Sequence, residues 1–295
     1  MNITYIDRRT GKALVESPPG EGFLKFLYHH PLGELALQTL VKRKALSAWY
    51  GRRMDGKGSA ERIAPFVEEY SIDLGESVKS LEEFTSFNDF FYRTLKPEAR
   101  PVGEGLVSPG DGKLLAFASP KQVKEFFVKG SQFTLPRFLQ DESLAQQFAT
   151  GPLLVLRLAP NDYHRFHFPY AGVPSALHMI RGWYYSVSPY AVMPNFGRVF
   201  CENKRAYTRL RTADRGDILL APVGATMVGS ILSTYTPDAE VQKGEEMGYF
   251  AFGGSSIVML LEPGRFQLDE DLLENTHQGK ETFVKMGEHI GSLAS

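Results

Sequence analysis

Two glycines and two serines stand directly before one of the most apolar runs in the sequence. Gly253, Gly254, Ser255 and Ser256 precede the five apolar residues 257–261. Glycine weakens a strand and usually marks a bend or a close approach of the backbone. One interpretation is a tight turn before a buried strand. The other is chemical: the Ser255 hydroxyl can attack the carbonyl carbon of Gly254, because glycine leaves that carbonyl open and tolerates a strained backbone.

A serine hydroxyl is a weak nucleophile, so this chemistry needs a base within hydrogen-bonding reach and an acid that orients the base. Asp111 lies in the sequence SPGDG, and His164 and His167 lie in DYHRFH. By residue type alone, Asp111 is typical of a turn, and the histidines suit a strand, a loop or a metal pair with Asp162. In a regular strand, residues three apart face opposite sides, so both histidines reach one site only if the segment turns locally.

Seven blocks of sequence occur in a specific order along most of the chain. They are SFNDFFYR (86–93), RPV (100–102), SPGDGKL (108–114), KGSQFTL (129–135), PNDYHRFHFP (160–169), KGEEMGYFAFGGSS (243–256) and ETFVKMGEHIG (281–291). In this order and combination they resemble the phosphatidylserine decarboxylases, a family made as an inactive proenzyme.

The resemblance implies that the chain cuts itself between Gly254 and Ser255, into a β chain (1–254) and an α chain (255–295). Attack by Ser255 converts the peptide to an ester, and elimination then leaves dehydroalanine, which hydrolyses to a pyruvoyl group and ammonia. This covalent pyruvoyl group is the expected cofactor, and no metal is expected. Ser256 stands where the family usually has threonine, and this leaves open which of the two serines is cut. Ser255 is favoured, because it directly follows the two glycines.

The resemblance also assigns roles to the candidate residues. It places Asp111, His167 and Ser255 in a triad for self-cleavage, and it gives His164 the role of proton donor in decarboxylation. The implied reaction converts phosphatidylserine to phosphatidylethanolamine through a Schiff base on the pyruvoyl group, in phospholipid biosynthesis. The pyruvoyl carbonyl accepts electrons much as pyridoxal phosphate does.

The elements that must position these residues change in character near residue 100. Residues 1–20 suggest a strand or an extended arm, and apolar spacing predicts helices in 21–53, 60–70 and 86–91. After Pro97, short β-branched and apolar runs such as 106–107, 153–158 and 283–290 alternate with glycine and proline, which is typical of short strands. We therefore predict an α+β fold: a helical membrane-facing section with an N-terminal arm (1–100), then a β-rich antiparallel core with barrel-sandwich-like character (101–295).

Composition limits the partners and the location of the protein. A net charge of −1 and the lack of a basic motif argue against nucleic acid, and one cysteine, Cys201, cannot form an internal disulfide. Residues 21–53 interleave aromatic and leucine side chains with basic ones, which suits either an interfacial helix on anionic lipid or an ordinary helix packed on the core. With the resemblance, this predicts peripheral attachment to the cytoplasmic side of the cell membrane, with phosphatidylserine and an anionic surface as partners. The two chains are expected to stay associated, and a homodimer is possible.

Two other functions compete with this prediction. The first is a pyruvoyl-dependent decarboxylase of a small soluble amino acid, against which the helices of 21–53 argue. The second is a non-enzymatic lipoyl-like module on a membrane-surface helical stalk, in which the glycine-serine sequence is only a turn. A serine hydrolase is less favoured, because no serine lies in a GxSxG sequence.

Overall fold

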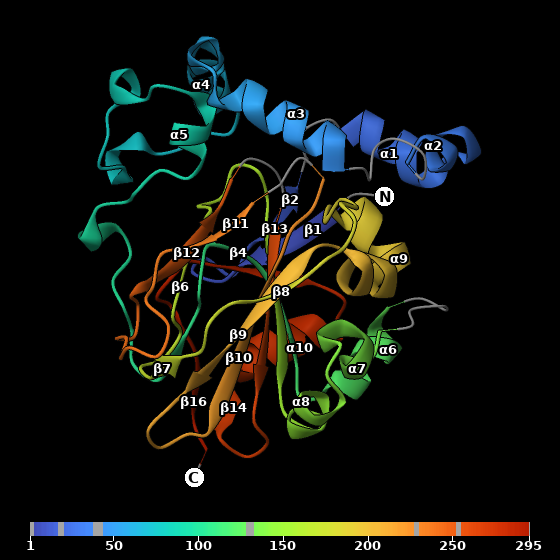
Figure 1. Ribbon diagram of the computed structural model, residues 1–295, viewed down its shortest axis with the longest axis vertical. Coiled ribbons are helices and arrows are strands. Elements are labelled where there is room, and N and C mark those ends of the chain that lie inside the picture. Colours follow the sequence, from blue (N-terminus) through green and yellow to red (C-terminus); the bar gives the residue numbers. More distant parts are fainter. Residues whose placement is uncertain are drawn as a thin grey trace.

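The computed structural model describes residues 3–16, 21–37, 44–127, 133–226, 230–251 and 255–294 of the 295-residue chain. Figure 1 shows the first helices lying across one end of the molecule, above a body of strands, with the C-terminus at the opposite end. The predicted α+β fold is confirmed, because helices dominate the first part of the chain and a large mixed sheet of short strands follows.

The helices fall into a group before residue 100 and a group after it. The first group, which we call the front helices, is α1 (Glu21–His29), α2 (Pro31–Ala36), α3 (Lys44–Asp55), α4 (Ile63–Glu69) and α5 (Phe87–Phe91), with single 3₁₀ turns at Lys57–Arg62, Leu74–Glu76, Leu81–Glu83 and Pro97–Ala99. The second is α6 (Pro120–Phe126), α7 (Leu135–Leu139), α8 (Glu142–Gln147), α9 (Pro189–Glu202) and α10 (Glu270–His277). Within the described ranges, no helix has both the length and the apolar character needed to cross a bilayer.

Most strands belong to one sheet, and two smaller sheets flank it. The large sheet runs in the order β2 (Ala13–Glu16), β1 (Ile3–Asp7), β15 (Glu281–Val284), β4 (Gly112–Phe117), β5 (Leu153–Leu158), β13 (Ser255–Leu261), β10 (Asp217–Val223), β9 (Arg205–Arg211) and β7 (Val173–Pro174), with β8 (His178–Ile180) also on β9. The others are β11 (Ile231–Ser233), β12 (Glu246–Phe250) and β6 (Arg165–His167), and β14 (Phe266–Leu268), β16 (His289–Leu293) and β3 (Leu106–Val107).

The centre of the large sheet is buried on both faces. Successive side chains of a strand point to opposite faces, so β13 sends Val258 and Leu260 to one core cluster and Ile257 and Met259 to the other. The first cluster is completed by α6 to α9, which lie on one side of the sheet in Figure 1. This explains why β13 is a continuous apolar run rather than an alternating one.

The front helices carry a small core of their own. Aromatic residues from α5 and its approach, together with residues of α3 and α4, form this cluster: Met54, Ile63, Phe84, Phe87, Phe90 and Phe91. Ser86 caps α5 by accepting a hydrogen bond from the Asp89 amide at 3.2 Å. The Tyr92 ring then packs 4.9 Å from Tyr249 of β12, which attaches α5 to the β core.

Several strand boundaries differ from the sequence predictions. The apolar stretch 283–290 was expected to be one run, but it contains the end of β15 and the start of β16, separated by a turn at Gly287 with φ +82°. Helices α6 to α10 were not predicted at all. In α9, Pro194 and the non-helical Asn195 interrupt the periodicity that would have revealed it. The division at residue 100 stays a prediction, and the structure adds that β1 pairs with β15 and so joins the core sheet.

Candidate active site

Ser255 is the first residue of β13, between two neighbouring strands of the large sheet. It lies opposite Leu158 of β5, and Ser256 lies opposite Val223 of β10. Both serines are fully buried. Because adjacent residues of a strand face opposite sides, only one of the two hydroxyls can face a given group. Gly253 and Gly254, the other half of the predicted cleavage sequence, lie outside the described residues.

His164 is the histidine that contacts the Ser255 hydroxyl, with 3.4 Å between Ser255 Oγ and His164 Nδ1. Nε2 of the same ring lies 3.0 Å from the carbonyl oxygen of Ala159. A carbonyl oxygen only accepts, so Nε2 carries the proton and Nδ1 presents a lone pair to Ser255. By contrast, the buried Ser256 Oγ has no hydrogen-bond partner among the described residues. The geometry thus distinguishes Ser255 from Ser256.

The environment of His164 keeps its imidazole neutral. The ring is fully buried and stacks on Phe91 at a centroid distance of 3.9 Å. Burial, followed by the positive charge of Arg93, lowers the pKa of His164 to about 3. A neutral imidazole is the form that can accept a proton from a hydroxyl.

His167 faces a different set of partners. Its Nδ1 lies 2.9 Å from the carbonyl oxygen of Gly244, so Nδ1 carries the proton, and its Nε2 accepts a hydrogen bond from the Tyr163 hydroxyl at 3.1 Å. Burial lowers the pKa of His167 and raises that of Tyr163. Among the described residues, no hydrogen bond joins His167 to Ser255. Only residues 165–167 form a strand, and His164 lies in the loop before it, so the two histidines are free to point differently.

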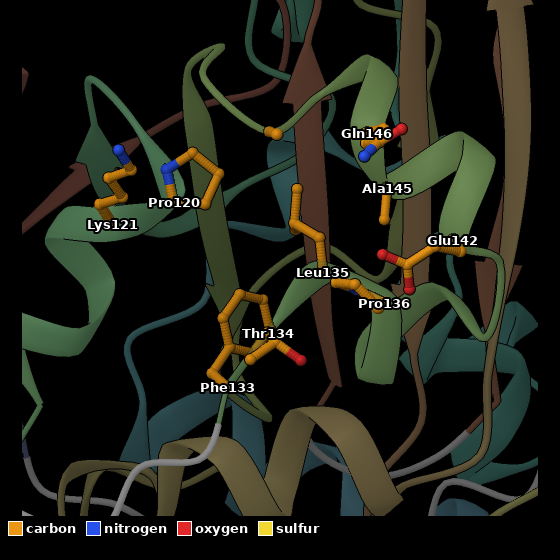
Figure 2. A pocket seen from close by; sticks show the side chains of 10 residues that line it. Pro120, Lys121, Phe133, Thr134, Leu135, Pro136, Glu142, Ala145 and Gln146 are labelled. Atoms are coloured by element: carbon orange, nitrogen blue, oxygen red, sulfur yellow. The ribbon is translucent and has the colours of Figure 1, made fainter.

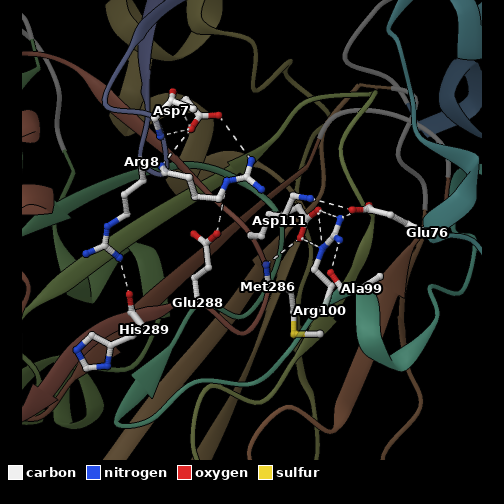
Figure 3. Close-up of polar contacts among 12 residues, drawn as sticks. Asp7, Arg8, Glu76, Ala99, Arg100, Asp111, Met286, Glu288 and His289 are labelled. Carbon is white, nitrogen blue, oxygen red and sulfur yellow. Dashed lines mark hydrogen bonds and ion pairs between the residues drawn. The ribbon is translucent and has the colours of Figure 1, made fainter.

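Asp111 is buried in the turn before β4 and is held by three donors. Arg100 donates to it from Nε at 2.9 Å and from Nη2 at 2.6 Å, and the Met286 amide donates at 2.8 Å (Figure 3). Arg100 also pairs with Glu76. Burial favours a neutral Glu76, but the bonds from Arg100 and Lys285 outweigh it and lower the pKa of Glu76 to about 2. Asp111 therefore sits in a connected ionic network.

Asp111 and His167 are close enough to interact electrostatically. The His167 amide donates to the carbonyl oxygen of Pro109 at 2.7 Å, which places β6 against the turn that carries Asp111. The negative charge of Asp111 opposes the effect of burial on the pKa of His167. The structure thus brings Ser255 together with His164, and Asp111 near His167, without a described bond between the two pairs.

Two aromatic residues at the site were not singled out from the sequence. Phe91 lies in the core cluster and also stacks on His164. The Tyr163 hydroxyl is the partner of His167. The place of these residues in the blocks 86–93 and 160–169 was the only available signal, since neither contact follows a strand or helix period.

A separate cavity of about 200 Å³ opens between α6, α7 and α8 (Figure 2). Its wall is mostly apolar and is made by Pro120, Lys121, Phe133, Thr134, Leu135, Pro136, Glu142, Ala145, Gln146 and Ala149. It contains none of the four predicted site residues, so it is distinct from the site at Ser255.

Ser255 is thus a buried serine at the start of a strand with a neutral imidazole at its hydroxyl, an arrangement in which a hydroxyl can act as a nucleophile. The family model for phosphatidylserine decarboxylase matches residues 87–292. Proteins named phosphatidylserine decarboxylase proenzyme are similar over nearly the whole chain: that of Fusobacterium nucleatum is 50% identical over 293 residues (98% of this chain, 97% of the relative), that of Desulfitobacterium hafniense 42% over 292 residues (98% of each), and that of Clostridium perfringens 42% over 292 residues (98% and 99%). The chain belongs to the phosphatidylserine decarboxylase family.

Proposed function

We propose that this protein decarboxylates phosphatidylserine to phosphatidylethanolamine, after cutting its own chain between Gly254 and Ser255. The observation that carries the proposal is the contact between Ser255 Oγ and the unprotonated Nδ1 of a neutral, buried His164. Expression of Ser255→Ala, which removes the attacking hydroxyl, tests it by the number of chains that result.

The residues present fit a pyruvoyl group derived from Ser255. The serine is fully buried, and its hydroxyl already faces the unprotonated Nδ1 of His164. The serine oxygen leaves with Gly254 as a carboxylate, the α-proton of Ser255 is removed, and water then replaces the nitrogen, which departs as ammonia. The resulting carbonyl supplies an electron sink for the loss of carbon dioxide from an amino acid headgroup.

The roles of the two histidines are part of the proposal. Following the family resemblance, Asp111 and His167 assist the cutting of the chain, and His164 donates the proton that replaces carbon dioxide. The position of His164 places its ring beside residue 255, but its Nδ1 carries no proton here and must take one up before it can donate. The same contact favours a second assignment, in which His164 Nδ1 itself takes the proton of the Ser255 hydroxyl during cutting.

Loss of Asp111 or His167 is expected to make uncut precursor accumulate. His167→Ala removes a candidate acid-base group, for which help of about 10² to 10⁴ in rate is typical. Asp111→Asn keeps the size of the side chain but removes its charge. The fraction of cut protein at fixed times after expression measures the effect, and normal processing in both variants would remove the two residues from the cutting reaction.

A control is needed because Asp111 is also structural. Removing one partner of a buried ion pair costs about 3–5 kcal/mol of stability, although Arg100 retains Glu76. Tyr163→Phe deletes only the hydroxyl that donates to His167 and leaves the ionic network intact. Thermal unfolding of all three variants separates a slow reaction from a misfolded protein.

The two pieces are expected to stay together after cutting. Residues 255–295 contribute β13, β14, β15 and β16, and three of these strands, β13, β15 and β16, pair with β1, β3, β4, β5 and β10 of the other piece. The bond from the Met286 amide to Asp111 also crosses between the pieces. Dissociation would expose a large buried core, which is unfavourable by about 25 cal/mol for each Å².

The front helices form the proposed attachment to the membrane. Large apolar side chains on α2 and α3 remain exposed: Leu32 at 64%, Leu35 at 61% and Trp49 at 51%. Arg53 lies 5.8 Å over the Trp49 ring, so basic charge accompanies apolar surface there. The basic residues Lys42 and Arg43, which the sequence prediction also used, lie outside the described residues.

Binding to vesicles that contain phosphatidylserine is expected to weaken with salt and with loss of this apolar surface. Raising the ionic strength from 0.1 to 1 M shortens the screening length from about 10 to about 3 Å. Burying one leucine is worth about 1.5–3 kcal/mol, so the double variant Leu32→Ser/Leu35→Ser should bind at least tenfold more weakly in a sedimentation assay. Met179→Ser, which alters an exposed apolar residue of β8, is the matched control. Equal binding by all variants, or binding that salt does not change, would contradict this attachment.

A further inference from the structure

The buried cation Arg93 lacks an anionic partner among the residues that the structure describes. It follows α5, and only 7% of its surface is exposed. Its guanidinium carbon lies 5.0 Å over the ring of Phe90, and its Nε is buried with no hydrogen-bond partner. Within the described ranges its guanidinium forms no hydrogen bond and no ion pair. A buried charge in this state is costly, so such groups are normally paired.

The other buried arginines show what satisfied arginines look like in this protein. Arg157 bonds to Glu16 and Glu281. Arg205 donates to three backbone carbonyl oxygens, including that of Phe138 at 2.7 Å. Arg100 forms the paired bonds to Asp111. Arg93 therefore differs from the other buried arginines, because its guanidinium is still able to bind an anion.

Arg93 lies near the candidate site. Phe91, two residues earlier, stacks on His164, and burial, followed by the charge of Arg93, lowers the pKa of His164. Two acids lie within electrostatic range of Arg93, namely Asp111 and Asp162. Neither is available, because Asp111 is held by Arg100 and Asp162 is paired with the buried Lys113 at 2.9 Å.

A phosphatidylserine headgroup brings two anions to this site, the carboxylate that leaves and the phosphodiester that stays. A cation bound to the carboxylate would stabilise the ground state more than the transition state, because the charge moves away from the carboxylate as carbon dioxide forms. The phosphodiester keeps its charge throughout the reaction. Its oxygens also match the planar fork of a guanidinium.

We propose that Arg93 binds the phosphodiester group of the substrate and thereby selects a phospholipid over free serine. The inference rests on the proposed function, since it concerns the substrate of that same site. It gives the buried charge a partner during the reaction and explains how a headgroup is held with its amine towards residue 255.

The experiment compares Arg93→Gln with the wild type in turnover of phosphatidylserine. The variant should be cut into two chains as usual and should show a KM about 10- to 100-fold higher, with a much smaller change in kcat, because a charge-assisted bond present throughout the reaction is lost. Arg209→Gln, which removes a half-exposed arginine of β9 that pairs with Asp217, is the control and should behave as wild type.

Two competitors identify the anion that is bound. A short-chain phosphatidylethanolamine carries the phosphodiester and no carboxylate. Free serine carries a carboxylate and no phosphodiester. Arg93→Gln should weaken inhibition by the former at least tenfold and leave inhibition by serine unchanged. The opposite pattern would assign Arg93 to the carboxylate, and no change in either would make Arg93 structural. Each of these two results overturns the proposal.

A second measurement covers the case in which Arg93→Gln is not cut. Binding of the short-chain phosphatidylethanolamine is then compared in Ser255→Ala and in Ser255→Ala/Arg93→Gln by calorimetry, where processing plays no part. Weaker binding in the double variant supports the proposal, and equal binding overturns it. Both proteins lack the Ser255 hydroxyl. The comparison between them therefore does not depend on cutting at Ser255.

Discussion

Replacing Ser255 with alanine is expected to leave a single uncut chain that releases no carbon dioxide from phosphatidylserine. In the proposed reaction this hydroxyl is the attacking group, and no other described hydroxyl forms a hydrogen bond with His164. Loss of the nucleophile also removes the source of the pyruvoyl group, so the effect should be complete rather than partial. Chain number on a denaturing gel and release of labelled carbon dioxide measure it.

Ser256→Ala is the matched control, one residue away. The Ser256 Oγ is buried without a described partner, so its removal breaks no bond and relieves an unsatisfied polar group. This variant should be cut and active. If Ser255→Ala were cut while Ser256→Ala stayed whole, the nucleophile would be Ser256 and the contact with His164 would have another meaning.

Replacing His164 with alanine is expected to separate cutting from catalysis. If Asp111 and His167 serve the cutting reaction, the variant should yield two chains. Its turnover of phosphatidylserine should nevertheless fall by about 10² or more, because the proton that replaces carbon dioxide loses its donor. Both quantities must be measured in one preparation, since a mixture of cut and uncut protein would lower the apparent activity by itself.

The alternative for His164 predicts a different result. If its Nδ1 takes the proton of the Ser255 hydroxyl, His164→Ala should remain uncut, and His164 then belongs to the cutting machinery. A variant that is cut and fully active would make the 3.4 Å contact merely structural. His178→Ala, at an exposed histidine of β8, controls for the loss of an imidazole elsewhere.

The strands of the core were predictable because their physical signals are local. The runs Leu106–Val107 and Leu153–Leu158 were expected as strands and are β3 and β5. Helices such as α7 (Leu135–Leu139) were missed because they are too short to show a helical period. Their stability comes from packing on the sheet, which involves distant residues that local patterns do not reveal.

At the candidate site, too, the residues themselves could be found from local sequence, whereas their contacts with distant parts of the chain could not. The residues Ser255, His164 and Asp111 were each singled out from their own blocks. Their partners were not: Arg100 and Met286 for Asp111, and Ala159 and Phe91 for His164. The protonated nitrogen of each histidine depends on a carbonyl oxygen that only the folded chain brings near. For the same reason the unpaired state of Arg93 became visible only in three dimensions.

Intact mass spectrometry of the purified, active protein tests the central claim most directly. The account predicts two pieces, residues 1–254 and 255–295, and the smaller should be lighter by one ammonia than the same peptide with a free serine at its start. That piece should also resist sequencing from its N-terminus. A single chain of full mass in a preparation that decarboxylates phosphatidylserine would contradict the account.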